Sequence, residues 1–154
     1  MTERVDFYVL KSTAALERWT YACRLIEKAY LRDLSIVVVS GTPAEARSLD
    51  DLLWTFNDRS FIPHKIWDGE PLDPAAKVHL TLEPAALPAA DLLVNLAARL
   101  PAQWQRHARI AEIIDADEEC RRLGRERFKS YRELKVPLET HQLDTHSEEF
   151  RDHG

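Results

Sequence analysis

The order of apolar and polar positions in the N-terminal part of the chain is typical of an α/β protein. Residues 5–10 form a short run of β-favouring side chains, and apolar residues then recur at alternating three- and four-residue steps over residues 16–30. Residues 36–39 are an uninterrupted β-branched run, as expected for an interior strand that helices cover on both faces. The pattern therefore predicts a strand, a helix and a strand in succession, within a three-layer α/β/α sandwich.

The second helix has a clear start signal in the sequence. Thr42, Pro43 and Glu45 supply the N-cap, N1 and N3 positions of a capping box. One stripe of the helix then collects the apolar residues of the segment, which are Ala46, Leu49, Leu52, Leu53 and Phe56. The helix is expected to run from Pro43 to about Trp54.

Short apolar runs in the rest of the chain predict strands near residue 65, at 78–82 and at 92–96, separated by turns that contain proline. Residues 109–114 fit either a last strand or a helical turn, and residues 117–134 are expected to form the final helix. Because no long helix separates these later strands, their directions are open. We expect a mixed, largely parallel central sheet.

The chain is expected to divide into one domain and a tail. A length of 154 residues with 45% apolar content supports a single core, and we assign residues 1–135 to one α/β domain. Pro137 stops the final helix and little apolar content follows it. Residues 136–154, with one Arg against five Asp or Glu, are therefore predicted to form an acidic, flexible C-terminal tail.

Composition and charge argue against several classes of protein. The chain shows no signal-peptide hydrophobic region and no apolar run near the roughly 20 residues of a membrane span, so we expect a cytoplasmic protein that is not bound to a membrane. Cys23 and Cys120 are far apart and fall on predicted core positions, which favours buried thiols over a disulfide or a zinc site. A net charge of −5 argues against wholesale binding of nucleic acid through its phosphates.

The segments that usually carry catalysis or hold a cofactor lack the necessary residues. The turn after the first strand reads KSTAA and has no glycine, so its backbone cannot approach a pyrophosphate as a GxGxxG turn does. His64 has no nearby nucleophile motif and is expected to make a structural hydrogen bond. Asp50 and Asp51 are adjacent on a helix and point about 100° apart, which fits a solvated face better than a shared proton site. We therefore predict no catalytic residue, cofactor or metal ion.

Trp54 stands apart from the apolar stripe of the second helix, roughly 140° from Leu49. A tryptophan in this position either packs beneath a neighbouring loop or contacts a partner. Phe61, Ile62 and Pro63 follow it closely, across a polar break. This concentration of apolar residues favours a docking surface for another protein.

The final helix carries a basic face that contains an aromatic residue. Residues 121–135 hold seven Lys or Arg against two Glu. Helical projection places one cluster, Cys120, Leu123, Tyr131 and Leu134, on the face expected to meet the core. The opposite face collects Arg121, Arg125, Phe128 and Arg132, with Lys129 at its flank. Such a run is ordinarily a solvated face, but a ring among guanidinium groups also suits an acidic peptide that ends in an aromatic residue, or a single-stranded nucleic acid.

Three motifs, in order and at characteristic spacing, resemble those of the chi subunit family of bacterial DNA polymerase III. They are LDDLLW at residues 49–54, SFIPH at 60–64 and LGRERFKSYR at 123–132, and the likeness begins at the VDFYVL strand and covers roughly residues 1–135. The resemblance implies a Rossmann-like α/β/α fold without a phosphate-binding loop. It also implies a non-catalytic accessory protein of the clamp-loader complex, associated with the bacterial replisome.

The resemblance further implies two binding surfaces. The family's positions for the acidic, phenylalanine-ended tail of single-stranded DNA-binding protein correspond to Arg125, Phe128, Lys129 and Arg132. The surface that receives psi, the small subunit linking chi to the clamp loader, corresponds to Trp54 and Phe61, and the adjoining Ile62 and Pro63 are assigned to it as well. A helicase is a possible competitor at that second surface. DNA is then contacted mainly indirectly.

Two other functions stay open on the residues alone. The basic helix at 121–135 can instead bind single-stranded nucleic acid directly, although the acidic net charge argues against this. A small nuclease or phosphotransferase would need a metal-binding carboxylate cluster that the sequence does not suggest. Asp117 departs from the family pattern, because its charge would oppose an acidic ligand unless it turns outward or pairs with an arginine.

Overall fold

The structure is a computed structural model that describes residues 2–57, 59, 61–69, 72 and 76–143. Its strands are β1 (Arg4–Leu10), β2 (Ile36–Val39), β3 (His64–Ile66), β4 (Val78–Thr81), β5 (Leu92–Asn95), β6 (Arg109–Ile114) and β7 (Leu138–Leu143). Its helices are α1 (Ala15–Leu31), α2 (Pro43–Thr55) and α3 (Glu118–Glu133), with short 3-10 helices η1 (Pro84–Ala86) and η2 (Trp104–Arg106). Within these ranges, no helix is long and apolar enough to cross a membrane.

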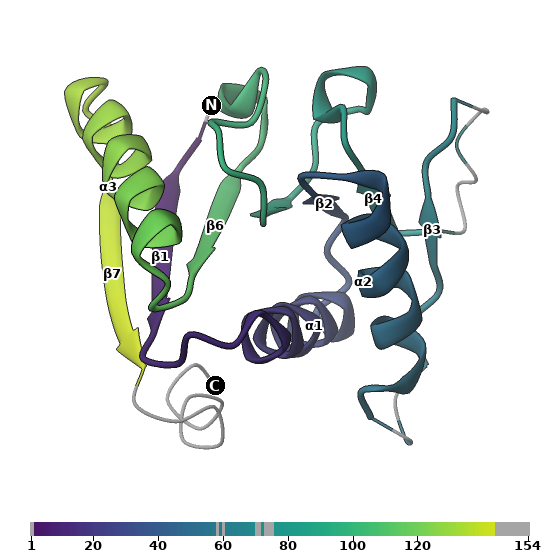
Figure 1. Cartoon of the computed structure of the whole chain (residues 1–154). Coiled ribbons are helices and arrows are strands. Elements are labelled where there is room, and N and C mark those ends of the chain that lie inside the picture. Colours follow the sequence, from purple (N-terminus) through teal and green to yellow (C-terminus); the bar gives the residue numbers. More distant parts are fainter. Residues whose placement is uncertain (1, 58, 60, 70–71, 73–75, 144–154) are drawn as a thin grey trace.

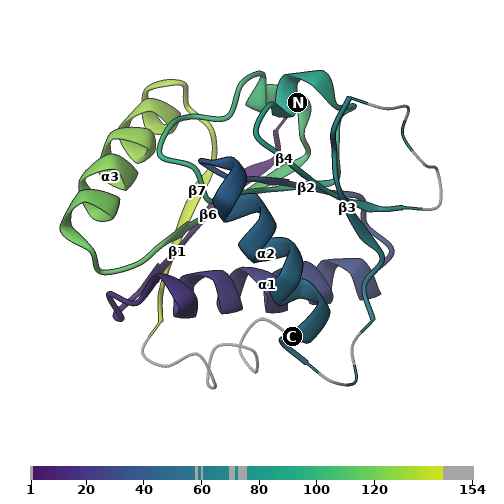
Figure 2. The ribbon, with the colours of Figure 1, turned by 45° about the vertical axis from the view of Figure 1, so that its right-hand side comes forward.

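The strands form one sheet in the order β3-β4-β2-β5-β6-β1-β7. Every strand pair in the described residues is parallel, so the sheet that we expected to be mixed is parallel throughout this part of the chain. Helices α1 and α2 cover one face of the sheet, and α3 covers the other together with η1 and η2 (Figure 1 and Figure 2). The α/β class and the three-layer arrangement are confirmed.

Several local predictions are confirmed in detail. The β-branched run is β2, and all four of its residues are buried, as a strand covered on both faces requires. Thr42 caps α2, with its hydroxyl accepting a hydrogen bond from the Glu45 N–H (3.1 Å), and Pro43 opens the helix. The ambiguous segment at 109–114 is strand β6.

The first part of the predicted tail is instead an edge strand of the sheet. Strand β7 pairs in parallel with β1, and the Val5 N–H donates to the Pro137 carbonyl (2.9 Å) where the pairing begins. The sequence LETHQL gives little sign of this, because an edge strand needs few apolar residues, and Leu143 is the one fully buried residue in β7. Residues 144–154, the rest of the predicted flexible tail, lie outside the described residues.

A buried carboxylate on β1 links that strand to its two neighbours, β6 and β7. Asp6 on β1 lies 3.2 Å from Arg4, 2.8 Å from Arg109 on β6 and 3.0 Å from His141 on β7. The His141 ring stacks on Tyr8 at a centroid distance of 4.8 Å. Burial alone would raise the pKa of Asp6, but the bonds from His141 and Arg109 and the charges of both arginines outweigh it and lower that pKa.

Two arginines occupy the carboxyl ends of the central strands, where α/β sheets of this kind usually bind ligands. Arg18 of α1 donates to the carbonyls of Ile113 (2.8 Å) and Leu96 (3.0 Å). Arg121 of α3 donates to the carbonyl of Leu10 (3.1 Å). The guanidinium groups thus occupy the region beyond the strand ends where nucleotide-binding α/β sheets place their ligand.

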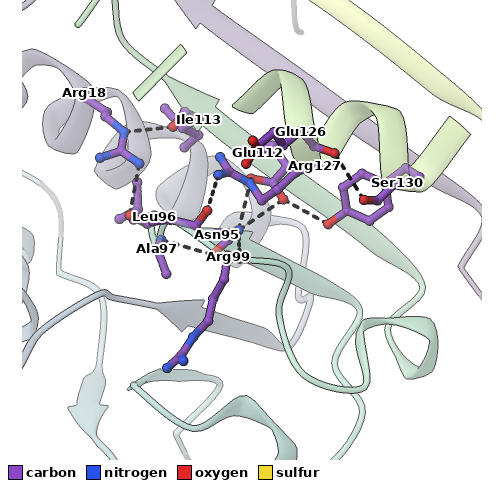
Figure 3. A network of polar contacts seen from close by, with 12 residues as sticks. Arg18, Asn95, Leu96, Ala97, Arg99, Glu112, Ile113, Glu126, Arg127 and Ser130 are labelled. Atoms are coloured by element: carbon purple, nitrogen blue, oxygen red, sulfur yellow. Dashed lines mark hydrogen bonds and ion pairs between the residues drawn. The ribbon is translucent and has the colours of Figure 1, made fainter. Parts of the chain in front are cut away.

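The centre of the α3 face holds a second buried charge network (Figure 3). Glu112 on β6 is fully buried, and it accepts hydrogen bonds from Arg127 Nε (3.0 Å), Tyr131 Oη (2.9 Å) and Asn95 Nδ2 (3.0 Å). Arg127 also donates to the carbonyl of Ala98 (2.6 Å). Sequence patterns did not indicate this network, because Glu112 lies in an apolar run and Arg127 lies in a basic one.

Replacing Glu112 by Ala should lower the free energy of unfolding by about 3–5 kcal/mol, because the Arg127 guanidinium would stay buried without its counter-charge. Denaturant unfolding measures the change. The double variant Glu112→Leu with Arg127→Met removes both charges and should recover much of the loss. A single variant as stable as the wild type would show that the network does not hold α3.

The Asp6 cluster should make part of the stability depend on pH. Because the pKa of Asp6 is lowered in the folded protein, folding favours the ionised carboxylate. The stability that Asp6 contributes is complete above its pKa in the unfolded chain, about 4, and is lost as the pH falls through its lower pKa in the folded protein. In urea unfolding, the wild type should therefore have a higher free energy of unfolding than Asp6→Asn at neutral pH, and this difference should become smaller in acid. A gap that is constant or widens in acid would contradict this assignment.

Candidate functional site

Helix α3 begins at a side-chain cap, which settles the position of Asp117. The Asp117 carboxylate accepts a hydrogen bond from the Cys120 N–H (3.0 Å), as an N-cap does. Because the carboxylate is engaged at the helix start and does not line the cavity described below, its charge does not face a ligand there. The concern that Asp117 opposes an acidic ligand is thereby reduced.

The buried face of α3 has nearly the direction that helical projection gave it and includes Tyr131, but other residues complete it. Gly124, Arg127 and Tyr131 are its buried residues, whereas Leu134, which we expected in the core, is 60% exposed. Phe128, expected on the opposite face, is half-buried and packs edge-on against Phe7 of β1, with ring centroids 5.2 Å apart. Leu134 lies on the same side of the helix as Arg127 but just beyond the last helical residue, so the partners of Glu112, and not this leucine, anchor α3 to the sheet.

A cavity of about 250 Å³ lies between α3 and the β1 and β7 strands. Its lining residues are Phe7, Val9, Ile114, Arg121, Gly124, Arg125, Phe128, Thr140 and Gln142. The floor is apolar and formed by β1, β6 and the Phe128 ring, while arginines and the polar side chains of β7 stand around it. Thr140 and Gln142 could not be foreseen, because the sequence placed them in the tail.

The cations predicted on α3 take different positions around this cavity. Arg125 lines it and is exposed, and in the described part of the chain no carboxylate pairs with its guanidinium. The Arg132 guanidinium lies 6.0 Å from the centre of the Phe128 ring, within cation–π range. Lys129 is exposed on α3 but does not line the cavity. The structure thus brings Arg125 and Phe128 together and leaves Lys129 and Arg132 at the periphery.

Gly124 explains how α3 can lie so close to the sheet. A Cβ atom at this position would clash with the Ile114 side chain of β6. The missing side chain lets the helix approach Ile114 and leaves space in the cavity that both residues line. A glycine in the interior of a predicted helix was the sequence signal for this close approach.

A second surface lies at the end of α2. Trp54 is 44% exposed and Phe61 is 71% exposed, with ring centroids 5.4 Å apart. The Trp54 ring also packs against the buried ring of His64, with centroids 4.2 Å apart, so a buried side chain supports the exposed pair. The prediction that Trp54 lies off the core stripe is confirmed.

His64 has a structural role, as predicted. Its Nδ1 lies 2.7 Å from the Ile62 carbonyl oxygen, and its Nε2 lies 3.1 Å from both the carbonyl and a carboxylate oxygen of Asp50. Asp50, expected on a solvated face, therefore ties α2 to the start of β3.

Two residues that we assigned to the second surface have other positions. Ile62 is 1% exposed and packs in the core beneath α1 and α2, so a partner cannot reach it. Pro63 is half-buried beside it. Alternation along an extended segment explains this, because neighbouring side chains at Phe61 and Ile62 point to opposite sides.

One group of side chains has a spacing that a metal ion could use, but its charges are already paired. Ligand atoms of Asp6, Glu139 and His141 lie within 4.8 Å of one another. Arg4 lies 3.2 Å from Asp6 and 3.3 Å from Glu139, and Arg109 lies 2.8 Å from Asp6. The group is therefore an ion-pair cluster that holds the strands together.

Comparison with known proteins gives a consistent result. Residues 1–139 match the model of the family described as DNA polymerase III chi subunit, HolC. The chain is 35% identical to DNA polymerase III subunit chi of Pseudomonas aeruginosa over 140 residues, which cover 91% of this chain and 96% of that protein. It is 25% identical to DNA polymerase III subunit chi of Haemophilus influenzae over 133 residues, 86% of this chain and 92% of that protein. The chain therefore belongs to the DNA polymerase III chi subunit family, and it is a replication accessory subunit.

Proposed function

We propose that this chi-family protein is a non-catalytic adaptor with two separate protein-binding surfaces. The cavity between α3 and β7 receives the acidic, phenylalanine-ended C-terminal tail of single-stranded DNA-binding protein. The exposed pair Trp54 and Phe61 receives psi and so links the protein to the clamp loader. A helicase that used the same aromatic pair would compete with psi.

The proposed binding of the tail rests on an apolar cavity floor beside the guanidinium of Arg125, which no carboxylate of the described residues pairs with. A terminal phenylalanine needs a small apolar cavity, and its α-carboxylate and neighbouring acidic side chains need cations at the mouth. Phe7 and Phe128 supply the first, and Arg125 supplies the second. A cavity of about 250 Å³ suits one aromatic side chain better than a drug-sized ligand.

The position of Phe128 favours a peptide over single-stranded nucleic acid at this helix. Base stacking needs an exposed aromatic face. Phe128 is half-buried, contacts Phe7 at its edge and has Arg132 above it, so little of the ring is available to a base.

The proposed docking of psi rests on the exposure of two adjacent aromatic side chains, Trp54 and Phe61. Large aromatic side chains that stand exposed on a rigid base are typical anchors of protein interfaces. Trp54 sits on α2 and Phe61 on the segment before β3, and His64 with Asp50 fixes these two elements relative to each other. The pair is thus preorganised for a partner.

Arg125→Ala should weaken binding of an acidic peptide that ends in Pro-Phe with a free carboxylate. The loss of a hydrogen bond to a charged group costs about 1.5–3 kcal/mol, or roughly tenfold to a hundredfold in Kd. Titration calorimetry on the full chain measures the affinity, and an amidated peptide should lose a comparable amount.

Arg122→Ala is the matched control for this experiment. Arg122 lies on the same helix but pairs with Glu119 (2.7 Å) and Glu126 (3.2 Å), and it does not line the cavity. Its removal should leave peptide affinity unchanged. Equal losses in both variants would mean that net charge, and not the cavity, attracts the peptide.

Phe61→Ala should reduce the affinity for psi by at least about 2 kcal/mol, the range of an interface hot spot, while tail-peptide binding stays unchanged. The measurement is calorimetry with purified psi. Leu16→Ala removes a comparably exposed apolar side chain (62%) at the start of α1 and serves as the control. Undiminished psi binding in Phe61→Ala would exclude this surface.

A further inference from the structure

A second cavity, of about 270 Å³, lies on the opposite face of the sheet from the α3 cavity. Its walls are β1, β6 and β7 on one side and the C-terminal half of α1 on the other. Apolar side chains of Leu25, Leu34 and Leu92 form part of its lining. Neither proposed protein-binding surface uses any of these residues.

Cationic side chains outnumber carboxylates around this cavity. Arg4, Lys28, Arg32 and Arg109 line it, together with His141, against Asp6 and Asp91. Asp91 is already engaged, because it accepts hydrogen bonds from the Ser35 N–H (2.9 Å) and hydroxyl (3.2 Å). Asp6 is shared among Arg4, Arg109 and His141. Arg4 also lies 3.3 Å from Glu139, but a guanidinium carries five N–H donors, so these two carboxylates leave donors on both arginines for a ligand.

Lys28 is the most unusual member of this group. Its Nζ is buried from solvent and has no hydrogen-bond acceptor among the described residues. Although the residue as a whole is half-buried, an ammonium group shielded in this way is costly, since no described group replaces its lost hydration. Burial, and next the charge of Arg32, lower the pKa of Lys28, as expected where two cations meet without an anion between them.

The spacing of Lys28 and Arg32 along α1 also favours a bound anion. The two residues are one turn apart on α1, and like charges at i and i+4 destabilise a helix. No carboxylate within the described ranges pairs with either side chain. An arrangement that is unfavourable when empty becomes favourable when an anion lies between the charges.

We propose that this cavity, lined by Lys28, Arg32, Arg4 and Arg109, is a binding site for a phosphate group carried by a nucleotide or by a nucleic-acid strand. Donors approach it from α1 on one side and from β1 and β6 on the other, which suits the several oxygens of a phosphate better than the two of a carboxylate. The apolar part of the lining can accept the attached sugar or base. A cavity of about 270 Å³ has room for the phosphate and part of the group attached to it.

The test is a titration of the full chain followed by backbone amide NMR, with three probes. These are inorganic phosphate, thymidine 5′-monophosphate and an oligothymidylate of about ten nucleotides. We expect saturable shifts at cavity residues with a nucleotide probe, and Lys28→Gln should weaken that binding about tenfold or more. Binding of the monophosphate identifies a nucleotide site, and binding of the oligomer alone identifies a strand site.

Lys65→Gln is the matched control, because Lys65 is an exposed lysine on β3 at the far edge of the sheet. It should bind the probes as the wild type does, and Arg125→Ala should do the same. The proposal would be overturned if the NMR shifts caused by the nucleotide probes were confined to α3, or if Lys28→Gln bound these probes as tightly as the wild type. A response to inorganic phosphate and to neither of the other probes would also overturn it. So would cavity shifts caused by the acidic Pro-Phe peptide in place of the phosphate probes.

Thermal unfolding gives a second measurement that does not depend on NMR. Without ligand, Lys28→Gln should be as stable as the wild type or more stable, because it removes a buried charge that lacks an acceptor. The nucleotide probe should raise the Tm of the wild type and not that of the variant. A clear loss of stability in Lys28→Gln without ligand would mean that the ammonium has a structural partner, and would overturn the proposal.

Discussion

The position of α3 depends on the buried carboxylate of Glu112. Charged groups removed from water are tolerated only with good partners, so Glu112 and Arg127 hold each other in one arrangement, which Tyr131 and Asn95 complete. Because Arg127 and Tyr131 must both face β6, the helix cannot rotate about its axis. The fixed rotation sets Phe128 against β1 and leaves Arg125 at the mouth of the cavity. The shape of the proposed binding surface is thus a consequence of a charge pair beneath it.

The fold keeps the architecture of nucleotide-binding proteins but fills their usual site. In parallel α/β sheets, ligands bind beyond the carboxyl ends of the strands, where backbone amides and helix N-termini meet. Arg18 and Arg121 donate to the strand carbonyls in that region. These contacts give the strand ends a structural role, and the two proposed cavities lie on the faces of the sheet beside the edge strand.

Elements with strong local signals could be predicted from the sequence. The β-branched run of β2 and the capping box at Thr42 depend on neighbouring residues alone, and both were found where expected. Errors arose where a distant partner decides the outcome. Arg127 is buried because Glu112 lies opposite it on β6, and β7 is a strand because it pairs with the open edge of β1. Of the residues that line the α3 cavity, Arg125 and Phe128 were predicted as site residues, while Thr140 and Gln142 depended on that pairing.

Strand β7 shows how one short element can belong to two cavities. Successive side chains of a strand point to opposite faces, so Thr140 and Gln142 line the cavity beside α3, and His141 between them lines the cavity beside α1. The same alternation on β1 sends Phe7 to one face and Asp6 to the other. Because Asp6 holds β7 through His141, the ion-pair cluster on the α1 face supports the wall of the cavity on the α3 face. The two surfaces are chemically separate, yet both require the same edge pairing.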